Sequence, residues 1–204
     1  MVFKRKDHFY KRAKREKRAS RAAYKIEELQ KRFKLIKRGE TVVDLGCAPG
    51  GWIEESLQIV GKAGRVIGID LLDLQINLPK NAFFIHGDMT NDENLQKIIE
   101  IAEKKADVVL SDMSPNLSGI SFADAYRSYE LGMLALEVCE KLLKADGNLV
   151  IKIFPGEEFE GFVKLLKTRF KKVKAVVPEA TRKTSSERYL VCLEFKIQTE
   201  NNAL

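Results

Sequence analysis

The sequence predicts an α/β fold with a mostly parallel, doubly wound sheet and helices on both faces. From residue 41 onward, short apolar runs rich in β-branched residues alternate with segments of helical periodicity. Strands that are buried on both faces of a parallel sheet have this composition. The first run ends in a glycine loop within VVDLGCAPGGW, residues 42–52, and a helical pattern begins at Trp52. A strand, a glycine turn and a helix start in this order are typical of Rossmann-like folds.

The N-terminal segment, residues 1–38, is strongly basic. It carries 16 Lys or Arg against 4 Asp or Glu, whereas the other 166 residues carry 20 bases and 25 acids. Apolar residues from Ala22 to Phe33 recur at helical spacing, so we expect a helix starting near Ser20 that packs on the domain. A basic arm on a mildly acidic body indicates a polyanionic partner. A solvated tail, a transit peptide and a nuclear signal are the alternatives, and the arm's acidic residues, with a helix leading directly into the domain, disfavour a cleaved transit peptide.

Seven strands and four further helices are expected after the arm. The predicted strands are Thr41–Leu45, Arg65–Ile69, Ala82–His86, Asp107–Ser111, Asn148–Ile153, Lys172–Val177 and Arg188–Phe195. The predicted helices are Ile53–Val60, Asn91–Lys104, Phe122–Ala145 and Glu157–Phe170. No helix fits between the last two strands, so we expect them to pair antiparallel and to give a seven-stranded sheet with one antiparallel edge strand. The domain should span residues 39–197, with a short tail at 198–204.

Composition excludes several classes of protein. No run approaches the roughly 18 apolar residues of a membrane helix, and no apolar secretory segment opens the chain. The three cysteines show no metal-binding or disulfide spacing, and two histidines are too few for a histidine-rich metal cluster. We therefore expect no metal, no membrane association and a reducing, cytoplasmic location.

Charged residues follow the predicted strands at corresponding positions. Asp44, Asp70, Asp88, Asp112 and Lys152 all lie at or just beyond strand ends. Because the carboxyl ends of parallel strands meet at one edge, these side chains should face a shared cleft. Each acid taken alone could instead cap a helix, and Asp88 is the best candidate for such a cap.

The glycine loop indicates the kind of ligand. Its glycines follow the order GxxxGG, which is neither the GxGxxG of dinucleotide sites nor a Walker loop. A ligand without phosphates suits this loop better, and we expect that ligand to lie where a Cβ would be. Asp70 follows the second strand, where an acid can bind two ribose hydroxyls. Asp70 therefore fits NAD as well as S-adenosylmethionine.

Six motifs, in this order and spacing, resemble those of the FtsJ family: DLGCAPGGW, IDLLDL, GDMT, SDMSPNLSG, VIKIFPGE and SSERYL. Members of this family are S-adenosylmethionine-dependent ribose 2′-O-methyltransferases. The resemblance extends from about Tyr10 to Phe195, and it implies the Rossmann-like methyltransferase fold.

The resemblance also implies site residues. A catalytic set would consist of Lys25, Asp112, Lys152 and Glu187, with Lys152 as the principal residue. Asp70 would bind the ribose of the cofactor, Asp88 would lie near its adenine, and Asp112 would lie beside its methionine end. The full set expected around the cofactor is Asp44, Gly46, Ala48, Pro49, Gly50, Gly51, Trp52, Asp70, Leu71, Asp88, Met89 and Asp112.

The chemistry of methyl transfer leaves two roles open for Lys152, a general base or a cation that orients the acceptor hydroxyl. Other acceptors fit less well. The turn after Asp112 lacks the aromatic residue of exocyclic-amine methyltransferases, and methylation at a base carbon needs a nucleophilic cysteine. Cys139 and Cys192 fall inside predicted elements, and Cys47 is a remote candidate. A non-catalytic RNA-binding assembly protein and a nicotinamide oxidoreductase are the alternative functions.

RNA is the expected partner, because a ribose methyltransferase must contact a 2′-hydroxyl, which DNA lacks. Family resemblance favours a uridine in large-subunit ribosomal RNA, free or in the assembled subunit, over transfer RNA or a messenger cap. We expect the protein to act as a monomer. Phosphate contacts are expected from Lys4, Arg5, Lys6, Lys11, Arg12, Lys14, Arg15, Lys17, Arg18, Arg21, Arg182 and Lys183.

Overall fold

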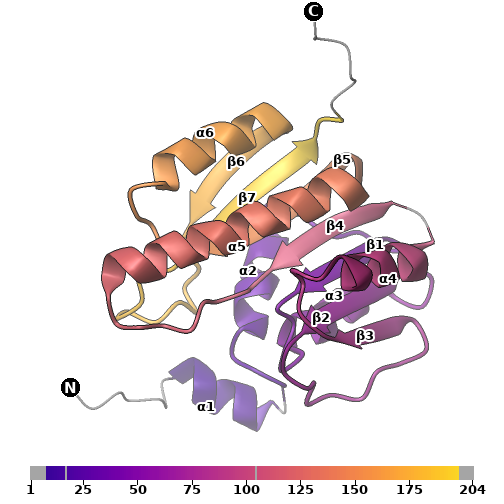
Figure 1. Ribbon diagram of the computed structural model, residues 1–204. Coiled ribbons are helices and arrows are strands. Elements are labelled where there is room, and N and C mark those ends of the chain that lie inside the picture. The colour runs from indigo at the N-terminus through magenta and orange to yellow at the C-terminus, as the bar shows by residue number, and fades with distance from the viewer. Residues whose placement is uncertain (1–7, 17, 104, 198–204) are drawn as a thin grey trace, which may run out of the picture.

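The computed structural model describes residues 8–16, 18–103 and 105–197 and has one sheet covered by helices on both faces (Figure 1). The strands are β1 (Thr41–Leu45), β2 (Arg65–Asp70), β3 (Ala82–His86), β4 (Ala106–Ser111), β5 (Leu143–Ile153), β6 (Phe170–Val176) and β7 (Arg188–Phe195). The helices are α1 (His8–Arg15), α2 (Ala23–Phe33), α3 (Gly51–Val60), α4 (Asp92–Ala102), α5 (Ser121–Leu142) and α6 (Phe159–Arg169). The tail at 198–204 lies outside the described residues.

The sheet confirms the predicted mostly parallel architecture. Its strand order is β3-β2-β1-β4-β5-β7-β6, and β1 to β5 pair in parallel. The antiparallel strand is β7, which lies one position in from the edge and pairs with both β5 and β6. After β5, the chain passes through α6 to β6 and leaves a gap one strand wide, which β7 fills. The order reverses between β1 and β4, and ligands bind at such switch points.

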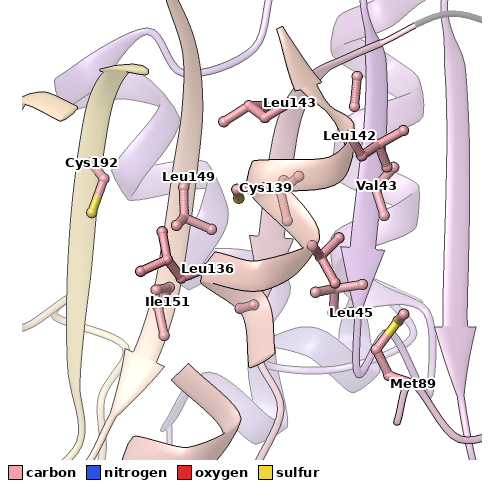
Figure 2. Close-up of a cluster of buried hydrophobic side chains, with 14 of the residues drawn as sticks. Val43, Leu45, Met89, Leu136, Cys139, Leu142, Leu143, Leu149, Ile151 and Cys192 are labelled. Atoms are coloured by element: carbon pink, nitrogen blue, oxygen red, sulfur yellow. The ribbon is translucent and has the colours of Figure 1, made fainter. Parts of the chain in front are cut away.

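Two apolar layers hold the sheet, one on each face. Successive residues of β1 point to opposite faces, as the pleat of a strand requires. Val43 and Leu45 belong to the layer under α4, α5 and α6, part of which is drawn in Figure 2, whereas Val42 belongs to the layer shared with α2 and α3. The layer with α2 and α3 fixes the end of the basic arm against the strands that carry the glycine loop.

The three cysteines are buried and free, as their sequence spacing suggested. Burial raises the pKa of each thiol, so these side chains are held as neutral thiols in the core. Their state gives no support to a cysteine nucleophile.

No helix within the described ranges is long and apolar enough to cross a membrane. In the same part of the chain, no group of three or more His, Cys, Asp or Glu side chains is arranged to hold a metal ion.

Candidate functional site

A pocket of about 290 Å³ lies at the carboxyl edge of the sheet, beside the switch point. Seven of the twelve residues expected around a cofactor line it: Gly46, Ala48, Asp70, Leu71, Asp88, Met89 and Asp112. They come from the ends of β1, β2, β3 and β4, as the strand-end pattern predicted. We call this space the glycine-loop pocket. The pocket is also lined by residues that the sequence did not indicate, among them Thr90, Met113 and Ser114, and Leu131 and Leu134 of α5.

Asp70 is held in place by the glycine loop. Its Oδ2 accepts a hydrogen bond from the Ala48 N–H at 2.8 Å, and its Oδ1 accepts one from Leu72 N–H at 2.9 Å. A carboxylate oxygen has room for more than one hydrogen bond, so both oxygens can still accept from vicinal hydroxyls. This geometry suits the ribose role expected for Asp70.

Asp88 does not cap a helix, which was the alternative role considered for it. The N-cap of α4 is Asn91, whose side chain accepts from Glu93 N–H. Asp88 instead accepts from Thr90 N–H at 2.9 Å, and this bond lowers the pKa of its carboxyl. An ionised side chain is therefore fixed by a local turn at the pocket wall.

The glycines of the loop serve a different purpose from the one we expected. Gly46 and Gly50 do adopt positive φ, at 74° and 116°. However, a Cβ on Gly46 would meet Met113 at 2.7 Å, and one on Gly51 would meet Ser20 at 2.5 Å. Protein atoms, not the ligand, therefore fill these spaces, and Pro49, Gly50 and Gly51 lie outside the pocket lining.

Trp52 also requires a correction. Its indole is 2% exposed, donates a hydrogen bond to Ala22 O at 2.8 Å, and packs on Tyr189 with ring centroids 5.8 Å apart. Burial of this large apolar ring stabilises the fold, and the single N–H of the indole is satisfied by the carbonyl oxygen just before α2. The side chain of Trp52 therefore joins α2 to α3 and β7 and does not face the cofactor space.

Asp44 lies fully buried at the end of β1. Neither of its carboxylate oxygens has a hydrogen-bond partner among the residues that the structure describes. Burial, and then the charges of Asp112 and Asp70, raise the pKa of Asp44 well above its usual range. Such a buried carboxyl group is costly to ionise without a neighbouring positive charge, and a cation bound nearby would favour its charged form.

The four residues of the expected catalytic set meet in one cluster. Lys25 of α2 forms an ion pair with Glu187 at 2.6 Å, and Lys152 of β5 forms one with Asp112 at 3.2 Å. The hydroxyl of Tyr189 connects the two pairs, because it accepts from Lys25 Nζ at 2.9 Å and donates to Asp112 Oδ1 at 2.7 Å. Tyr189 lies within the SSERYL motif, but the motif alone gave no sign of this linking role.

The positive charges of Lys152 and Lys25 favour the ionised form of Asp112. Desolvation raises the pKa of Asp112, but the charges of Lys152 and Lys25 and the hydrogen bond from Tyr189 outweigh it and lower the pKa. Lys152 also donates to the backbone oxygen of Asp112 at 2.5 Å. Asp112 is thus an anion that holds the ammonium group of Lys152 in one position.

A second pocket of about 410 Å³ opens on the other side of this cluster, and we call it the Lys25 pocket. Lys25 and Glu187 line it, while Asp112 lines the glycine-loop pocket, and Ser114 lines both. The lysine–carboxylate cluster therefore stands between two adjoining spaces. One space can hold a donor and the other an acceptor, and the reacting atoms would then meet beside Asp112, whose ion-pair partner Lys152 lines neither pocket.

Basic side chains border the Lys25 pocket. Arg21 and Arg182 line it, and burial followed by the nearby charge of Arg182 lowers the pKa of Arg21. Two guanidinium groups gathered at one pocket form a site of positive potential for an anion. Lys183 is exposed in the same loop as Arg182.

The remaining basic candidates divide into three groups. Lys11, Lys14 and Arg15 are exposed on α1, and Arg12 is paired with Glu16 at 2.8 Å. Arg18 is a correction, because its guanidinium lies 3.4 Å or less from the carboxylates of Glu16, Glu27 and Glu55 and so joins the arm to α2 and α3. Lys4, Arg5, Lys6 and Lys17 lie outside the described residues.

Comparison with known proteins indicates a methyltransferase family. Residues 18–195 match the family model for FtsJ-like methyltransferases. The ribosomal RNA large subunit methyltransferase E of Methanobrevibacter smithii is 45% identical over 193 residues, which cover 95% of this chain and 92% of that protein. The corresponding Methanocaldococcus jannaschii protein is 44% identical over 195 residues, covering 94% of this chain and 80% of the relative.

A solved structure shares the fold. The crystal structure of a Plasmodium falciparum protein assigned as a ribosomal RNA methyltransferase superposes with a TM-score of 0.76 at 30% identity, covering 87% of this chain and 98% of that one. The family model spans both pockets and the cluster between them, and the described residues fit an S-adenosylmethionine site through the Asp70 and Asp88 carboxylates and the unpaired Asp44. This chain belongs to the FtsJ-like methyltransferase family.

Proposed function

We propose that the protein transfers the methyl group of S-adenosylmethionine to the 2′-hydroxyl of a ribose in RNA. The leading candidate for the methylated nucleotide is a uridine in large-subunit ribosomal RNA. The observation that carries this proposal is the cluster of Lys25, Asp112, Lys152 and Glu187 between two adjoining pockets. The relatives named ribosomal RNA large subunit methyltransferase E support the choice of RNA.

The cofactor supplies an electrophilic methyl group on a sulfonium. The protein's own contribution is to position the acceptor oxygen, which accounts for much of the catalysis of such displacements. Two contacts of Lys152 fall on Asp112. An ammonium group has three N–H donors, so one remains to orient the acceptor hydroxyl. Lys25, held by Glu187 and Tyr189, fixes the opposite side of the acceptor.

The basic border of the Lys25 pocket suits the phosphates that flank the reacting ribose. Arg21 and Arg182 lie at the pocket itself, and the exposed bases of α1 extend the positive surface away from it. Phosphate contacts of this kind set affinity and register, whereas the pocket selects the ribose.

Methyl-labelled S-adenosylmethionine and a large-subunit ribosomal RNA transcript test the proposal. The label should enter the RNA and should protect one phosphodiester bond from alkaline hydrolysis, because a 2′-O-methyl group removes the attacking hydroxyl. Lys152→Ala should abolish the transfer, and Lys164→Ala, on the exposed surface of α6, should not. Label in a base, or full transfer by Lys152→Ala, would contradict the assignment.

We further propose that the enzyme acts as a monomer in the cytoplasm and that it rejects DNA. A DNA strand of the same sequence should take no label, since it lacks the acceptor hydroxyl. The same assay with assembled large subunits, compared with free RNA, identifies the form of the substrate. A transfer RNA or a capped messenger that is labelled faster than either would overturn the ribosomal assignment. RNA binding without any transfer would favour the non-catalytic alternative.

A further inference from the structure

A third hollow adjoins the Lys25 pocket at the start of α5. It encloses about 790 Å³, and we call it the Phe122 hollow. It shares Ser121, Ala125 and Pro155 with the Lys25 pocket. The glycine-loop pocket, the Lys25 pocket and the Phe122 hollow therefore form a row along one edge of the molecule, and neither the family's catalytic set nor the expected cofactor residues reach the third.

Two aromatic side chains of this hollow are exposed to solvent. Phe122 is 80% exposed and Tyr126 is 48% exposed, and both line the hollow. Four residues apart on one helix, they lie on the same face. Leu117 and Ile120, in the loop just before α5, are 63% and 52% exposed. A cluster of exposed apolar side chains beside a substrate pocket marks a binding surface.

The backbone that carries this surface is fixed in place. Asp124 accepts hydrogen bonds from Ser118 N–H and Oγ–H, each at 2.8 Å, and from Gly119 N–H at 3.1 Å. Ser128, one turn further along α5, accepts from Phe154 N–H at 3.0 Å. The loops after β4 and β5 are thus both tied to α5. A rigid platform loses little conformational entropy when a ligand binds.

The charges around the hollow distinguish a base from a phosphate. Arg127 lines it together with three carboxylates, Glu130, Glu157 and Glu158. This balance repels a phosphate, but carboxylate oxygens accept hydrogen bonds from the exocyclic amino groups of cytosine, adenine and guanine. Aromatic side chains provide the stacking surface that an unpaired base requires.

We infer that the Phe122 hollow binds the base of a nucleotide next to the methylated one, and that this base carries an exocyclic amino group. The inference rests on the proposed function, because the row of spaces is continuous only if the Lys25 pocket holds the reacting ribose. The phosphates then face Arg21 and Arg182, and the neighbouring base stacks on Phe122 and Tyr126 away from them.

Steady-state methylation of a short RNA substrate tests this inference. Phe122→Ala and Tyr126→Ala should each raise the KM for RNA about tenfold, in the range expected for loss of one stacked base. Cofactor affinity and thermal stability should stay as in the wild type, and Phe122→Trp should retain the wild-type KM. Ile197→Ala, which truncates an apolar side chain that is 57% exposed on another surface, is the control.

Substrates that lack one base at a time identify the bound nucleotide. One abasic position next to the target should raise the wild-type KM as much as Phe122→Ala does, and in Phe122→Ala that position should cause no further loss. Replacing that base by uracil, which has no amino group, should reproduce part of the effect. An unchanged KM in Phe122→Ala, while the wild type still methylates RNA, would overturn the inference and leave the proposed function intact. A defect seen with assembled subunits alone would also overturn it, because a protein would then be the partner.

Discussion

Tyr189 links the two lysine–carboxylate pairs of the site through one hydroxyl group. Burial, followed by the charges of Asp112 and Glu187, raises the pKa of this phenol well above its usual range, so the hydroxyl stays protonated and can donate to Asp112. Its oxygen simultaneously accepts from Lys25. The Lys25–Glu187 pair and the Lys152–Asp112 pair are therefore connected through a single neutral group.

Tyr189→Phe should lower kcat about 10- to 100-fold, since hydrogen bonds to charged groups contribute roughly 1.5–3 kcal/mol and each 1.4 kcal/mol is tenfold in rate. The ring should keep its packing on Trp52, so the fold should survive. Single-turnover methylation measures the effect. Tyr129→Phe, in a ring that packs on Phe162 outside the cluster, should leave the rate unchanged. A rate loss of similar size in both variants would argue against the linking role.

Asp44 gives a prediction with a definite pH dependence. Its pKa is raised in the folded protein, so the folded state binds more protons than the unfolded state above about pH 4, where a free Asp ionises. Stability then falls as pH rises through that window. Asp44→Asn removes this cost, so its melting temperature should exceed that of the wild type at neutral pH.

The melting advantage of Asp44→Asn should shrink as the pH is lowered toward 4. Although Asp44→Asn should raise the melting temperature, it should weaken cofactor binding. Affinity for S-adenosylmethionine should fall more than affinity for S-adenosylhomocysteine, because only the first carries a sulfonium charge to interact with the carboxylate. Scanning calorimetry measures the melting temperatures, and titration calorimetry measures the two affinities. Equal losses for the two ligands, or a lower melting temperature at every pH, would contradict this account of Asp44.

Asp112 and Lys152 of the proposed catalytic set were predictable from sequence because they lie in short motifs at strand ends, whereas Lys25 on α2 and Glu187 before β7 were placed only by the family resemblance. Trp52 was misplaced for the same reason, since it lies within the most diagnostic motif, yet its indole points into the layer shared with α2. Arg18 was misassigned because its three carboxylate partners come from α2, α3 and Glu16. Sequence order alone does not show which side chains meet across elements.

At the scale of elements, local patterns located the strands well but not the transitions between them. Lys144 and Ala145 are good helix formers, so α5 was extended to residue 145, whereas the helix ends at Leu142 and β5 begins at once. The position of β7 between β5 and β6 depends on which neighbour it pairs with. This pairing depends on contacts across the whole sheet, so no local sequence pattern indicates it.

The segment before α2 is tightly bound to the start of α3. Arg18 pairs with Glu55 at 2.5 Å, Ala19 N–H donates to Glu54 Oε2 at 3.0 Å, and Trp52 reaches Ala22 O. These contacts place Lys25 in the site and also fix the basic arm relative to the glycine loop. The two segments also approach closely at Gly51, where an added Cβ would lie 2.5 Å from Ser20 Oγ.

Gly51→Ala should therefore destabilise the protein by about 1–3 kcal/mol, because overpacking forces the backbone apart. It should also weaken RNA binding, since α1 and Lys25 would move together. Ser20→Ala keeps the Cβ but removes the oxygen that lies 2.5 Å from the added methyl, so the double variant should recover most of the loss. Thermal unfolding measures the loss of stability, and titration with RNA measures the loss of binding.

Gly161→Ala on α6 provides the control for Gly51→Ala. No atom lies within 4 Å of a Cβ at that position, and Ala is favoured over Gly inside a helix by about 1 kcal/mol. Gly161→Ala should stabilise the protein without affecting RNA binding. Equal melting temperatures for Gly51→Ala and the wild type would show that the contact with Ser20 is not a constraint.

For the whole molecule, charge and chemistry are distributed unevenly. The four residues of the proposed catalytic set and the two pockets lie at one edge of the sheet, while the exposed bases Lys11, Lys14 and Arg15 lie on α1, at the end of the molecule toward which β4 and β6 point (Figure 1). The acidic remainder of the chain repels RNA elsewhere. Such a distribution favours one orientation of the RNA on the enzyme before any base is read.

This arrangement predicts how binding depends on salt. Each phosphate contact that is lost should reduce the slope of log affinity against log salt by about one unit. Lys11→Glu with Lys14→Glu on α1 should therefore reduce the slope by about two, with kcat at saturating RNA unchanged because both residues lie outside the cluster. Lys164→Glu with Lys167→Glu makes the same change in net charge on α6, whose side chains line neither pocket. If the arm directs the RNA, the α6 pair should leave the slope almost unaltered. Equal slopes in the two double variants would mean that net charge, and not the placement of the arm, determines RNA binding.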